Sequence, residues 1–293
     1  MVMIAENQNN MIILKPKEYE KNHLALVQNS KNIDLTILNK FESHTLLQQN
    51  TAALMDRVDS KFVLPIKLFT PLMTAISEDY SILSAYGRKI FSYQTTYFDN
   101  KERQFYLDHH NGKLNRYKVR YRRYVESDMG YMEIKFKNNK KRTIKQRIPM
   151  NCTSPDQASV NQFVEKTLGY YINLETALFV NYQRITLLSK SNLERITIDL
   201  NLSFHNASNH KKSIQDKVFI IEIKQERKPY PSKCRDFLKL KGIKSTNFSK
   251  YCMGTILTNI SESESKSGFT STPLKANRFK SVINNLEKLN KLH

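Results

Sequence analysis

Basic side chains occupy every second position in one stretch of this sequence. Arg116, Lys118, Arg120 and Arg122 alternate with mainly apolar residues between positions 116 and 124. Because side chains alternate between the two faces of a β-strand, this spacing places the cations on one face. The arginine guanidinium is a planar fork of donors that matches the oxygens of a phosphate group. The stretch therefore predicts a strand face that binds phosphate.

Six further stretches show the same alternation of charged or polar positions with apolar ones. They are residues 57–64, 131–137, 141–148, 182–186, 195–200 and 219–224. A charged face on a single strand usually meets solvent. Here, however, the faces select arginine and lysine, and their isolated carboxylates include Glu133 and Glu222 of the repeated tripeptide Glu-Ile-Lys. This selection favours a polar interior that several strands share.

Closure of the sheet would create such an interior. When strands form a barrel and helices cover its apolar outside, the charged faces point inward. Cations held close together at low dielectric repel one another, so this interior needs anions. A triphosphate with a divalent metal ion supplies them. The carboxylates Glu133, Asp199 and Glu222 are hard oxygen ligands that suit Mg²⁺ or Mn²⁺.

The elements that must position these residues are mostly strands. We expect strands at 57–64, 80–86, 90–98, 115–125, 130–137, 141–149, 174–188, 193–203 and 217–225. We expect helices at 66–77, 157–168, 232–241 and 248–259, and short helices in the stretch that follows Asp34. Many strands with few short helices are typical of an α+β domain built around a mostly antiparallel sheet. His109 and His110 are interpreted as a turn before the strand at 115–125, and not as acid–base groups or a metal pair.

The chain of 293 residues divides into three parts. Residues 1–33 are rich in Asn, Gln and Lys and predict a loosely ordered arm, and residues 34–259 form the expected domain. Residues 260–293 combine a Ser-rich linker at 261–271 with an amphipathic helix. The apolar positions of this helix are Phe279, Val282, Ile283, Leu286 and Leu289.

The net charge is strongly positive. Lys and Arg number 47 against 27 Asp and Glu, which gives a formal charge of +20 and predicts a polyanionic partner. No apolar run approaches the roughly 20 residues of a membrane helix, and residues 1–10 lack the apolar stretch of a signal peptide, so we expect a cytoplasmic protein. Cys152, Cys234 and Cys252 are far apart and are interpreted as free thiols. With only 7 Gly, the chain has no glycine-rich phosphate loop.

Several ordered motifs carry a family resemblance that covers about residues 34–259. They are MDRVDSKFVLP (55–65), TTYFDN (95–100), YLDHHNGKLNRYKVRYRRY (106–124), YMEIKFKNNKKRTIKQRI (131–148), ERITIDLNL (194–202), FIIEIK (219–224) and NFSKY (247–251). Together they resemble the polyphosphate polymerase domain of the vacuolar transporter chaperone (VTC) family in its bacterial form. That family belongs to the triphosphate tunnel metalloenzymes.

The resemblance implies a closed antiparallel tunnel of about eight strands that binds the triphosphate of ATP with Mn²⁺ or Mg²⁺. Such an enzyme transfers the terminal phosphoryl group to a growing inorganic polyphosphate chain and releases ADP. Transferred by motif, the metal ligand is Glu222. The phosphate ligands are Lys61, Arg120, Arg122, Lys135, Lys145, Arg195 and Lys250, with Arg116, Arg147, Arg184 and Ser249 as further ligands. We expect Arg120, Arg122, Arg195 and Lys135 to act in catalysis.

One difference from the wider superfamily indicates to which of its branches the chain belongs. Arg57, Asp59 and Lys61 stand where two alternating glutamates often precede a lysine. This favours the polymerase-like branch over thiamine triphosphatases and adenylate cyclases. Without a membrane segment in the chain, coupling of synthesis to transport would need a separate membrane protein partner.

Two other functions remain open on the sequence. The same tunnel could hydrolyse tripolyphosphate or nucleoside triphosphates, with water as the acceptor. A charge of +20 together with 15 Tyr and 15 Phe also permits a non-catalytic protein that binds polyphosphate or nucleic acid. Nucleic acid is disfavoured, because the chain has no recognised nucleic-acid motif and its strand faces intersperse carboxylates among the cations.

Overall fold

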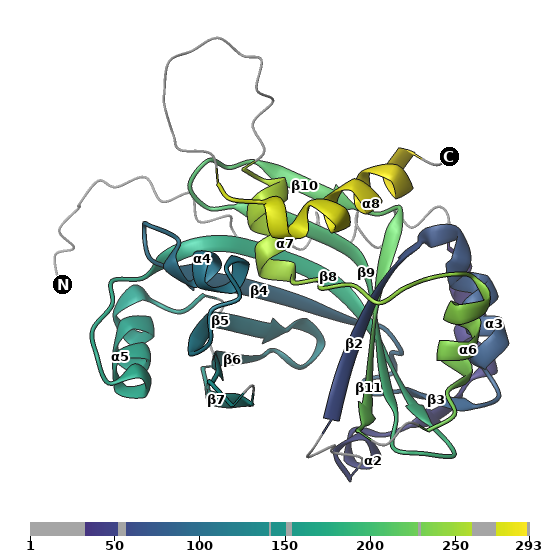
Figure 1. Ribbon diagram of the computed structural model, residues 1–293. Coiled ribbons are helices and arrows are strands. Elements are labelled where there is room, and N and C mark those ends of the chain that lie inside the picture. The colour runs from purple at the N-terminus through teal and green to yellow at the C-terminus, as the bar shows by residue number, and fades with distance from the viewer. Residues whose placement is uncertain are drawn as a thin grey trace, which may run out of the picture. The chain divides into compact units, whose positions relative to one another are not determined.

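An 11-stranded sheet organises the computed structural model of this protein (Figure 1). The structure describes residues 33–51, 57–140, 142–150, 154–227, 230–259 and 274–291. Eight strands follow one another across the sheet as β2 (Arg57–Pro65), β11 (Val218–Glu226), β9 (Arg195–Asn206), β8 (Glu175–Ser189), β4 (Phe91–Asp99), β5 (Arg116–Tyr124), β6 (Met129–Lys137) and β7 (Thr143–Pro149). Neighbours along this path are antiparallel.

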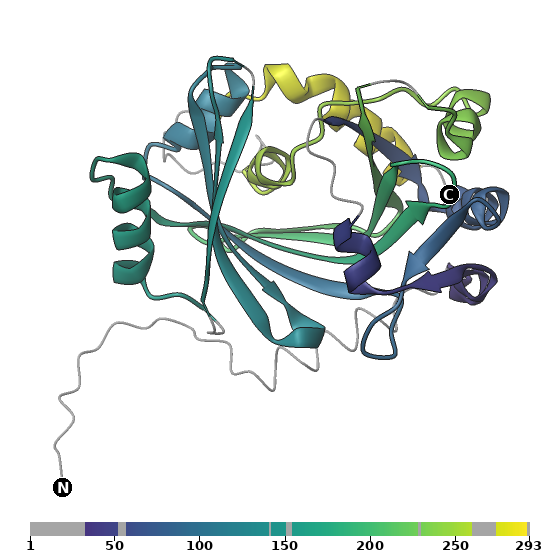
Figure 2. The same cartoon turned by 90° about the horizontal axis from the view of Figure 1, so that it is seen from below.

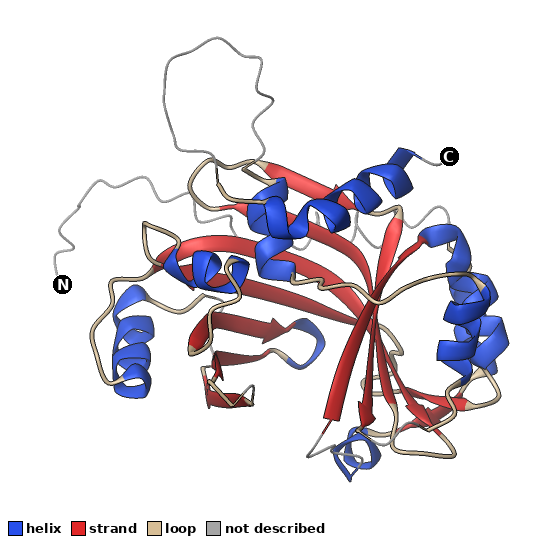
Figure 3. Cartoon of the chain, in the orientation of Figure 1, coloured by secondary structure: helices blue, strands red, loops and turns tan. Residues whose placement is uncertain are grey.

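Three short strands extend the sheet beside this path. β3 (Tyr80–Leu83) pairs with β8 and β10 (Lys212–Gln215) with β9, both antiparallel, whereas β1 (Glu42–His44) runs parallel to β3. The expected α+β class, a mostly antiparallel sheet with flanking helices, is therefore confirmed (Figure 3). All nine expected strands are present, while β1 and β10 lack a strong alternation and were missed.

The expected closed barrel is not found among the described residues. The path ends at β2 and β7, and no ladder joins these two strands, so the sheet is open between them. The backbone ahead of helix α7 takes the free edge of β2 instead. There the Thr246 amide donates to the Lys61 carbonyl at 2.8 Å, and the Lys61 ammonium donates to the Phe248 carbonyl at 3.0 Å. In Figure 2 the two ends of the sheet bend around α7 (Lys250–Leu257).

Helices cover the apolar outer face of the sheet in two places. α3 (Phe69–Ile76), α6 (Lys233–Leu240) and the 3₁₀ helix η1 (Leu35–Lys40) bury one cluster against β2, β9 and β11, in which the rings of Phe69 and Phe219 meet edge to face. α5 (Gln157–Leu168) packs Val160 and Val164 against Met132 of β6. These outer residues alternate along the strands with the charged positions. The apolar side chains therefore lie on the outer face, under the helices, and the charged ones on the inner face, as expected.

A third cluster fills one end of the inner face. α7, α4 (Gln104–His110) and α8 (Lys280–Lys291) pack there against apolar residues of β2, β8, β9 and β11. α8 confirms the amphipathic helix expected near the C-terminus, since Phe279, Val282, Ile283 and Leu286 are all buried. The short helix α2 (Leu46–Thr51), which precedes β2, also matches expectation.

Helix α4 corrects one expectation, because His109 and His110 close a helix and do not form a turn. The buried carboxylate of Asp99 explains its formation. It accepts hydrogen bonds from the backbone amides of Phe105 and Tyr106, both at 2.9 Å, and so satisfies donors at the helix start that would otherwise lack partners. Asp99 lies six residues before Phe105 and is not the N-cap residue of α4, so a local capping pattern does not predict this cap.

Some expectations lie outside the described residues. They are positions 1–32 of the expected arm, the Ser-rich stretch 261–271 and Lys141 at the start of one expected strand. The division at residue 259 stays a prediction. Among the described helices, none has the length and apolar character needed to cross a bilayer.

Gly254 makes the close approach of α7 to the sheet possible. A Cβ at this position would lie 2.4 Å from Phe204 Cδ1 and 2.6 Å from Leu178 Cδ2. We therefore expect Gly254→Ala to destabilise the protein by about 1–2 kcal/mol, because overpacking at about 1–3 kcal/mol exceeds the helix-propensity gain of about 0.5–1 kcal/mol. Urea unfolding measures the difference, and an unchanged or higher midpoint would contradict this packing.

Candidate phosphate-binding site

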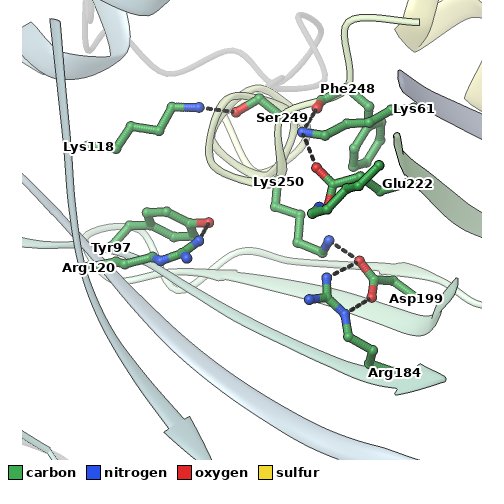
Figure 4. A network of polar contacts seen from close by, with 11 residues as sticks. Lys61, Tyr97, Lys118, Arg120, Arg184, Asp199, Glu222, Phe248, Ser249 and Lys250 are labelled. Atoms are coloured by element: carbon green, nitrogen blue, oxygen red, sulfur yellow. Dashed lines mark hydrogen bonds and ion pairs between the residues drawn. The ribbon is translucent and has the colours of Figure 1, made fainter. Parts of the chain in front are cut away.

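The charged alternating positions point to one shared inner face of the sheet. Cross-strand register aligns them in rows, for example Tyr97, Arg120 and Glu133 across β4, β5 and β6. Toward the other end of the strand order, Glu222 of β11 lies opposite both Lys61 of β2 and Thr197 of β9. Figure 4 shows side chains from both halves directed into the same space below α7. The shared polar interior is thus present although the barrel is open.

A cavity of about 490 Å³ lies at one end of this face. Its cationic lining consists of Arg122, Arg147, Arg184, Arg195 and Lys224. Four tyrosines, Tyr86, Tyr93, Tyr124 and Tyr131, also line it, and the Arg184 guanidinium lies over the Tyr93 ring at 5.1 Å from the centroid. The ring contacts the face of the guanidinium by cation–π interaction, while Asp199 binds its donor edge.

Polar atoms near the cavity are buried without a partner among the described residues. They include Arg122 Nε, Thr95 Oγ1, Thr197 Oγ1 and Tyr182 Oη. Arg122 as a whole is only 8% exposed. A buried donor without an acceptor costs free energy, so such a group is retained where a ligand completes it. The orphaned Arg122 donor and the Thr197 hydroxyl fit an oxygen-rich anion.

Each of three carboxylates on the inner face, the buried Glu133 and Asp199 and the partly exposed Glu222, is shared between two cations. Glu133 accepts from Arg120 Nε at 2.7 Å and also contacts Lys145. Asp199 binds Arg184 through both oxygens, at 2.6 and 2.9 Å, and also contacts Lys250 (Figure 4). Such sharing orients the cations while leaving excess positive charge on the face.

Glu222 is the third carboxylate that two cations share. Its carboxylate contacts Lys224, and one oxygen lies 3.9 Å from Lys61 Nζ. Burial alone would raise the pKa of Glu222, but Lys224 and Lys61 outweigh burial and hold the pKa well below its usual range. The same balance, with Arg184 and Lys250 as the cations, lowers the pKa of Asp199 to about 2. Both groups are therefore carboxylates at neutral pH.

Three lysines lie directly opposite one another across neighbouring strands. Lys118 of β5 faces Lys135 of β6, which faces Lys145 of β7. Like charges in this position destabilise a sheet. The charge of Arg120, followed by burial, lowers the pKa of Lys135 well below its usual value, and burial lowers that of Lys118. The row of lysines therefore weakens the sheet by itself, and it is better explained by a bound anion that contacts all three.

Replacing Lys135 should remove the repulsion among the three lysines. We expect Lys135→Met to stabilise the protein without ligand by up to about 1 kcal/mol and to weaken polyphosphate binding. Between the lowered folded pKa and the ordinary value of 10.5, the unfolded chain binds the extra proton. Wild-type stability should therefore rise with pH in that window, and the variant should lose this rise.

Urea unfolding from pH 7 to 10 checks the expectation, with Lys244→Met as a control at an exposed lysine. A destabilised variant that keeps the pH slope would contradict the arrangement.

The N-terminus of α7 faces the interior between the two halves of the sheet. Ser249 caps the helix by accepting from the Cys252 amide at 3.4 Å, and Lys118 Nζ donates to the Ser249 hydroxyl at 3.0 Å (Figure 4). Lys250 extends from the first turn to Asp199. Helix N-termini favour anions because their amides carry partial positive charge.

The structure brings the predicted residues together on the inner face but divides them into groups. Arg122, Arg147, Arg184 and Arg195 line the cavity. Around it, paired to the shared carboxylates, are Arg120, Lys145, Lys61 and Lys250. Lys135 lies in the lysine row, Ser249 caps α7, and Arg116 lies at the opposite end of β5, where its Nε donates to His109 Nδ1 at 3.2 Å.

Sequence reasoning did not select several residues that the site uses. Lys224 lines the cavity and Lys118 joins the lysine row, although both stand at the alternating positions that revealed their neighbours. The same period-two pattern could have found Tyr93 and Tyr97 of β4. Asp199 and Glu133 anchor guanidinium groups, a role that depends on contacts between strands distant in sequence.

The described residues contain no cluster of three or more His, Cys, Asp or Glu side chains that could hold a metal ion by themselves. A metal ion that arrives with a triphosphate needs less, since Mg²⁺ usually takes one or two carboxylates and completes its shell with phosphate oxygens and water. Glu222 is ionised and faces the interior, so its carboxylate fits that limited role.

A curved antiparallel sheet with cations and shared carboxylates on its inner face is the architecture of the triphosphate tunnel class. The VTC domain matches residues 56–259 of this chain. The protein therefore belongs to the VTC domain family, which confirms the resemblance seen in its motifs.

Solved structures with a similar fold come from distant proteins. A candidate adenylate cyclase from Vibrio parahaemolyticus is 10% identical, with 68% of this chain and 97% of that chain covered and a TM-score of 0.41. A candidate adenylyl cyclase from Hippeastrum, described as having a dominant triphosphatase activity, is 13% identical over 68% of this chain and 95% of its own, with a TM-score of 0.41. No curated protein matches the sequence.

Proposed function

We propose that this protein transfers the terminal phosphoryl group of ATP to inorganic polyphosphate. The observation that carries the proposal is the cavity in which four guanidinium groups and Lys224 converge, with buried polar atoms nearby that have no partner in the described part of the chain. A compact, highly charged chain of phosphates satisfies both features, whereas a duplex nucleic acid needs an exposed basic surface. Membership of the VTC domain family supports the same substrate class.

The chemistry requires positioning and charge neutralisation more than covalent participation. A terminal oxygen of polyphosphate attacks the γ-phosphorus of ATP, the bond from the β–γ bridging oxygen to that phosphorus breaks, and ADP leaves. No proton has to move, so the lack of a cavity-lining histidine among the described residues agrees with the scheme. Arg120, Arg122 and Arg195 bind oxygens of the transferring group, with Lys135 beside them.

The remaining cations follow the phosphate chain. Lys61 and Lys250 approach from β2 and α7, while Lys145 and Arg147 approach from β7. Arg116, Arg184 and Ser249 complete the proposed set. The shared carboxylates keep these side chains in fixed orientations, which lowers the cost of reorganisation when charge shifts during transfer.

Glu222 is the residue that would hold a divalent ion, Mn²⁺ or Mg²⁺, together with phosphate oxygens. A bound ion would neutralise charge on the transferring group. Glu222 itself already holds Lys224 and Lys61, so it also fixes two cations at the site.

The deciding experiment incubates the purified protein with ATP, Mn²⁺ and a short polyphosphate primer. Gel electrophoresis measures chain length, while coupled assays measure ADP and free phosphate. Longer polyphosphate appearing with equimolar ADP is the expected result. Free phosphate without chain growth would replace the proposal with a tripolyphosphatase or nucleoside triphosphatase, and absence of turnover would favour a binding protein.

A separate membrane protein partner stays a prediction. Co-purification from native membranes would test it, and recovery of the protein without any membrane component would count against it.

A further inference from the structure

Residues 274–279, the C-terminal segment that leads into α8, contact helix α4 beside the inner face. The Tyr106 hydroxyl donates to the Lys275 carbonyl, and Arg278 Nη1 donates to the His110 carbonyl at 3.0 Å. The Phe279 ring stacks on His109, with ring centroids 6.1 Å apart. This segment lies beyond residue 259, where the family match ends, so the family pattern assigns it no role.

The turn after α4 is shaped to admit Arg278. Gly112 has a φ of +70°, which glycine adopts without strain. A Cβ at Gly112 would lie 2.2 Å from Arg278 Nη1, so any larger residue would displace the guanidinium. The missing side chain at Gly112 therefore leaves room for the Arg278 guanidinium beside this turn.

Four cations act on His109: Lys118, Arg116, Arg278 and, more weakly, Lys61, which also lies near Glu222. Arg116 Nε donates to His109 Nδ1 at 3.2 Å, and Arg278 is held by the adjacent His110. Lys118 lies two residues from Arg116 on the same face of β5, and its positive charge disfavours protonation of His109. Burial and then the charges of Lys118, Arg116 and Arg278 lower the pKa of His109 to about 2, so the ring is a neutral acceptor at physiological pH.

The first three of these cations form a cluster that differs from the rest of the inner face, because it lacks a shared carboxylate among the described residues. The contacts of its members are neutral: Arg116 donates to the Lys113 carbonyl at 2.6 Å, and Lys118 donates to Ser249 Oγ at 3.0 Å. The nearby carboxylate of Asp108 is paired with Lys113 at 3.4 Å. Cations brought together without a carboxylate need another anion.

We propose that Arg116, Lys118 and Arg278 form a second anion site that holds polyphosphate beyond the triphosphate cavity, with the C-terminal segment supplying the third cation. Arg116 and the cavity residue Arg122 are six positions apart on β5, which corresponds to about 20 Å at roughly 3.3 Å per residue. A triphosphate in the cavity cannot reach this site, whereas a longer chain can. The inference rests on the proposed polyphosphate substrate.

Binding measurements without metal or ATP test the site apart from catalysis. The full chain is titrated at low salt with tripolyphosphate and with polyphosphate of about one hundred units. We expect Arg278→Gln to bind the long chain about three- to fivefold more weakly and tripolyphosphate as tightly as wild type, the size expected for one exposed cation. Arg278→Lys should retain most of the affinity, because it keeps the charge.

Lys288→Gln is the matched control, because it removes the same charge from an exposed position farther along α8. Thermal unfolding of each variant verifies that the segment still folds. Equal affinity of Arg278→Gln and wild type for the long chain would overturn the site, as would equal weakening for both ligands or the same loss in the control. If wild type binds no polyphosphate at all, the proposed function fails as well, which separates the two outcomes.

Discussion

Arg122→Ala should lower phosphoryl transfer by about 100- to 1000-fold, the loss that follows removal of one charge-stabilising donor. Arg122 is buried, lines the cavity and has an Nε without a partner among the described residues, so this donor lacks a protein acceptor. The fold should tolerate the change, because Arg122 is not the cation that holds Glu133, Asp199 or Glu222 through a described ion pair.

Arg123→Ala is a close control for this experiment. The neighbouring arginine points to the other face of β5 and pairs with Asp128 at 2.6 Å. It should keep wild-type turnover. Arg122→Lys should recover only part of the activity, because an ammonium keeps the charge but not the planar fork. Steady-state rates at saturating ATP measure all three, and wild-type turnover of Arg122→Ala would refute the assignment.

Glu222→Gln should have the second large effect, a loss of activity of about 100-fold or more. The amide is a weaker metal ligand than the carboxylate and carries no charge to balance Lys224 and Lys61. We expect the Mn²⁺ concentration needed for half-maximal activity to rise. Mn²⁺ binding should also weaken when it is measured by calorimetry in the presence of a non-hydrolysable ATP analogue.

The metal dependence separates a ligand role from a purely electrostatic one. Glu226→Gln removes a carboxylate from the same strand at a position whose described partner is Tyr230, and it should leave Mn²⁺ affinity unchanged. If Glu222→Gln lowers the rate but binds Mn²⁺ as tightly as wild type, Glu222 only orients Lys224 and Lys61, and the metal-ligand role is wrong.

The spacing of residues along the chain is enough to predict which side chains share a face. A period of two is a local property of extended backbone, so Arg116, Arg120 and Arg122 were assigned to one face and Val119 to the other without knowledge of the fold. The outer clusters confirm this separation. Strong alternation likewise predicted the strands, and apolar residues at helical spacing predicted α8, whereas the weakly patterned β1 and β10 were missed.

The tertiary structure decided how these faces meet. Alternation cannot specify whether two sheet edges pair, and here the Thr246 backbone takes the β2 edge that a closed barrel would need. Nor does it specify partners: Asp199 binds Arg184 and Lys250, which come from a neighbouring strand and from a helix 51 residues away. The placement of Arg278 beside His110 is of the same kind. Local spacing fixes the direction of a side chain along its own strand, but charge pairing depends on distances between segments that only the folded chain brings together.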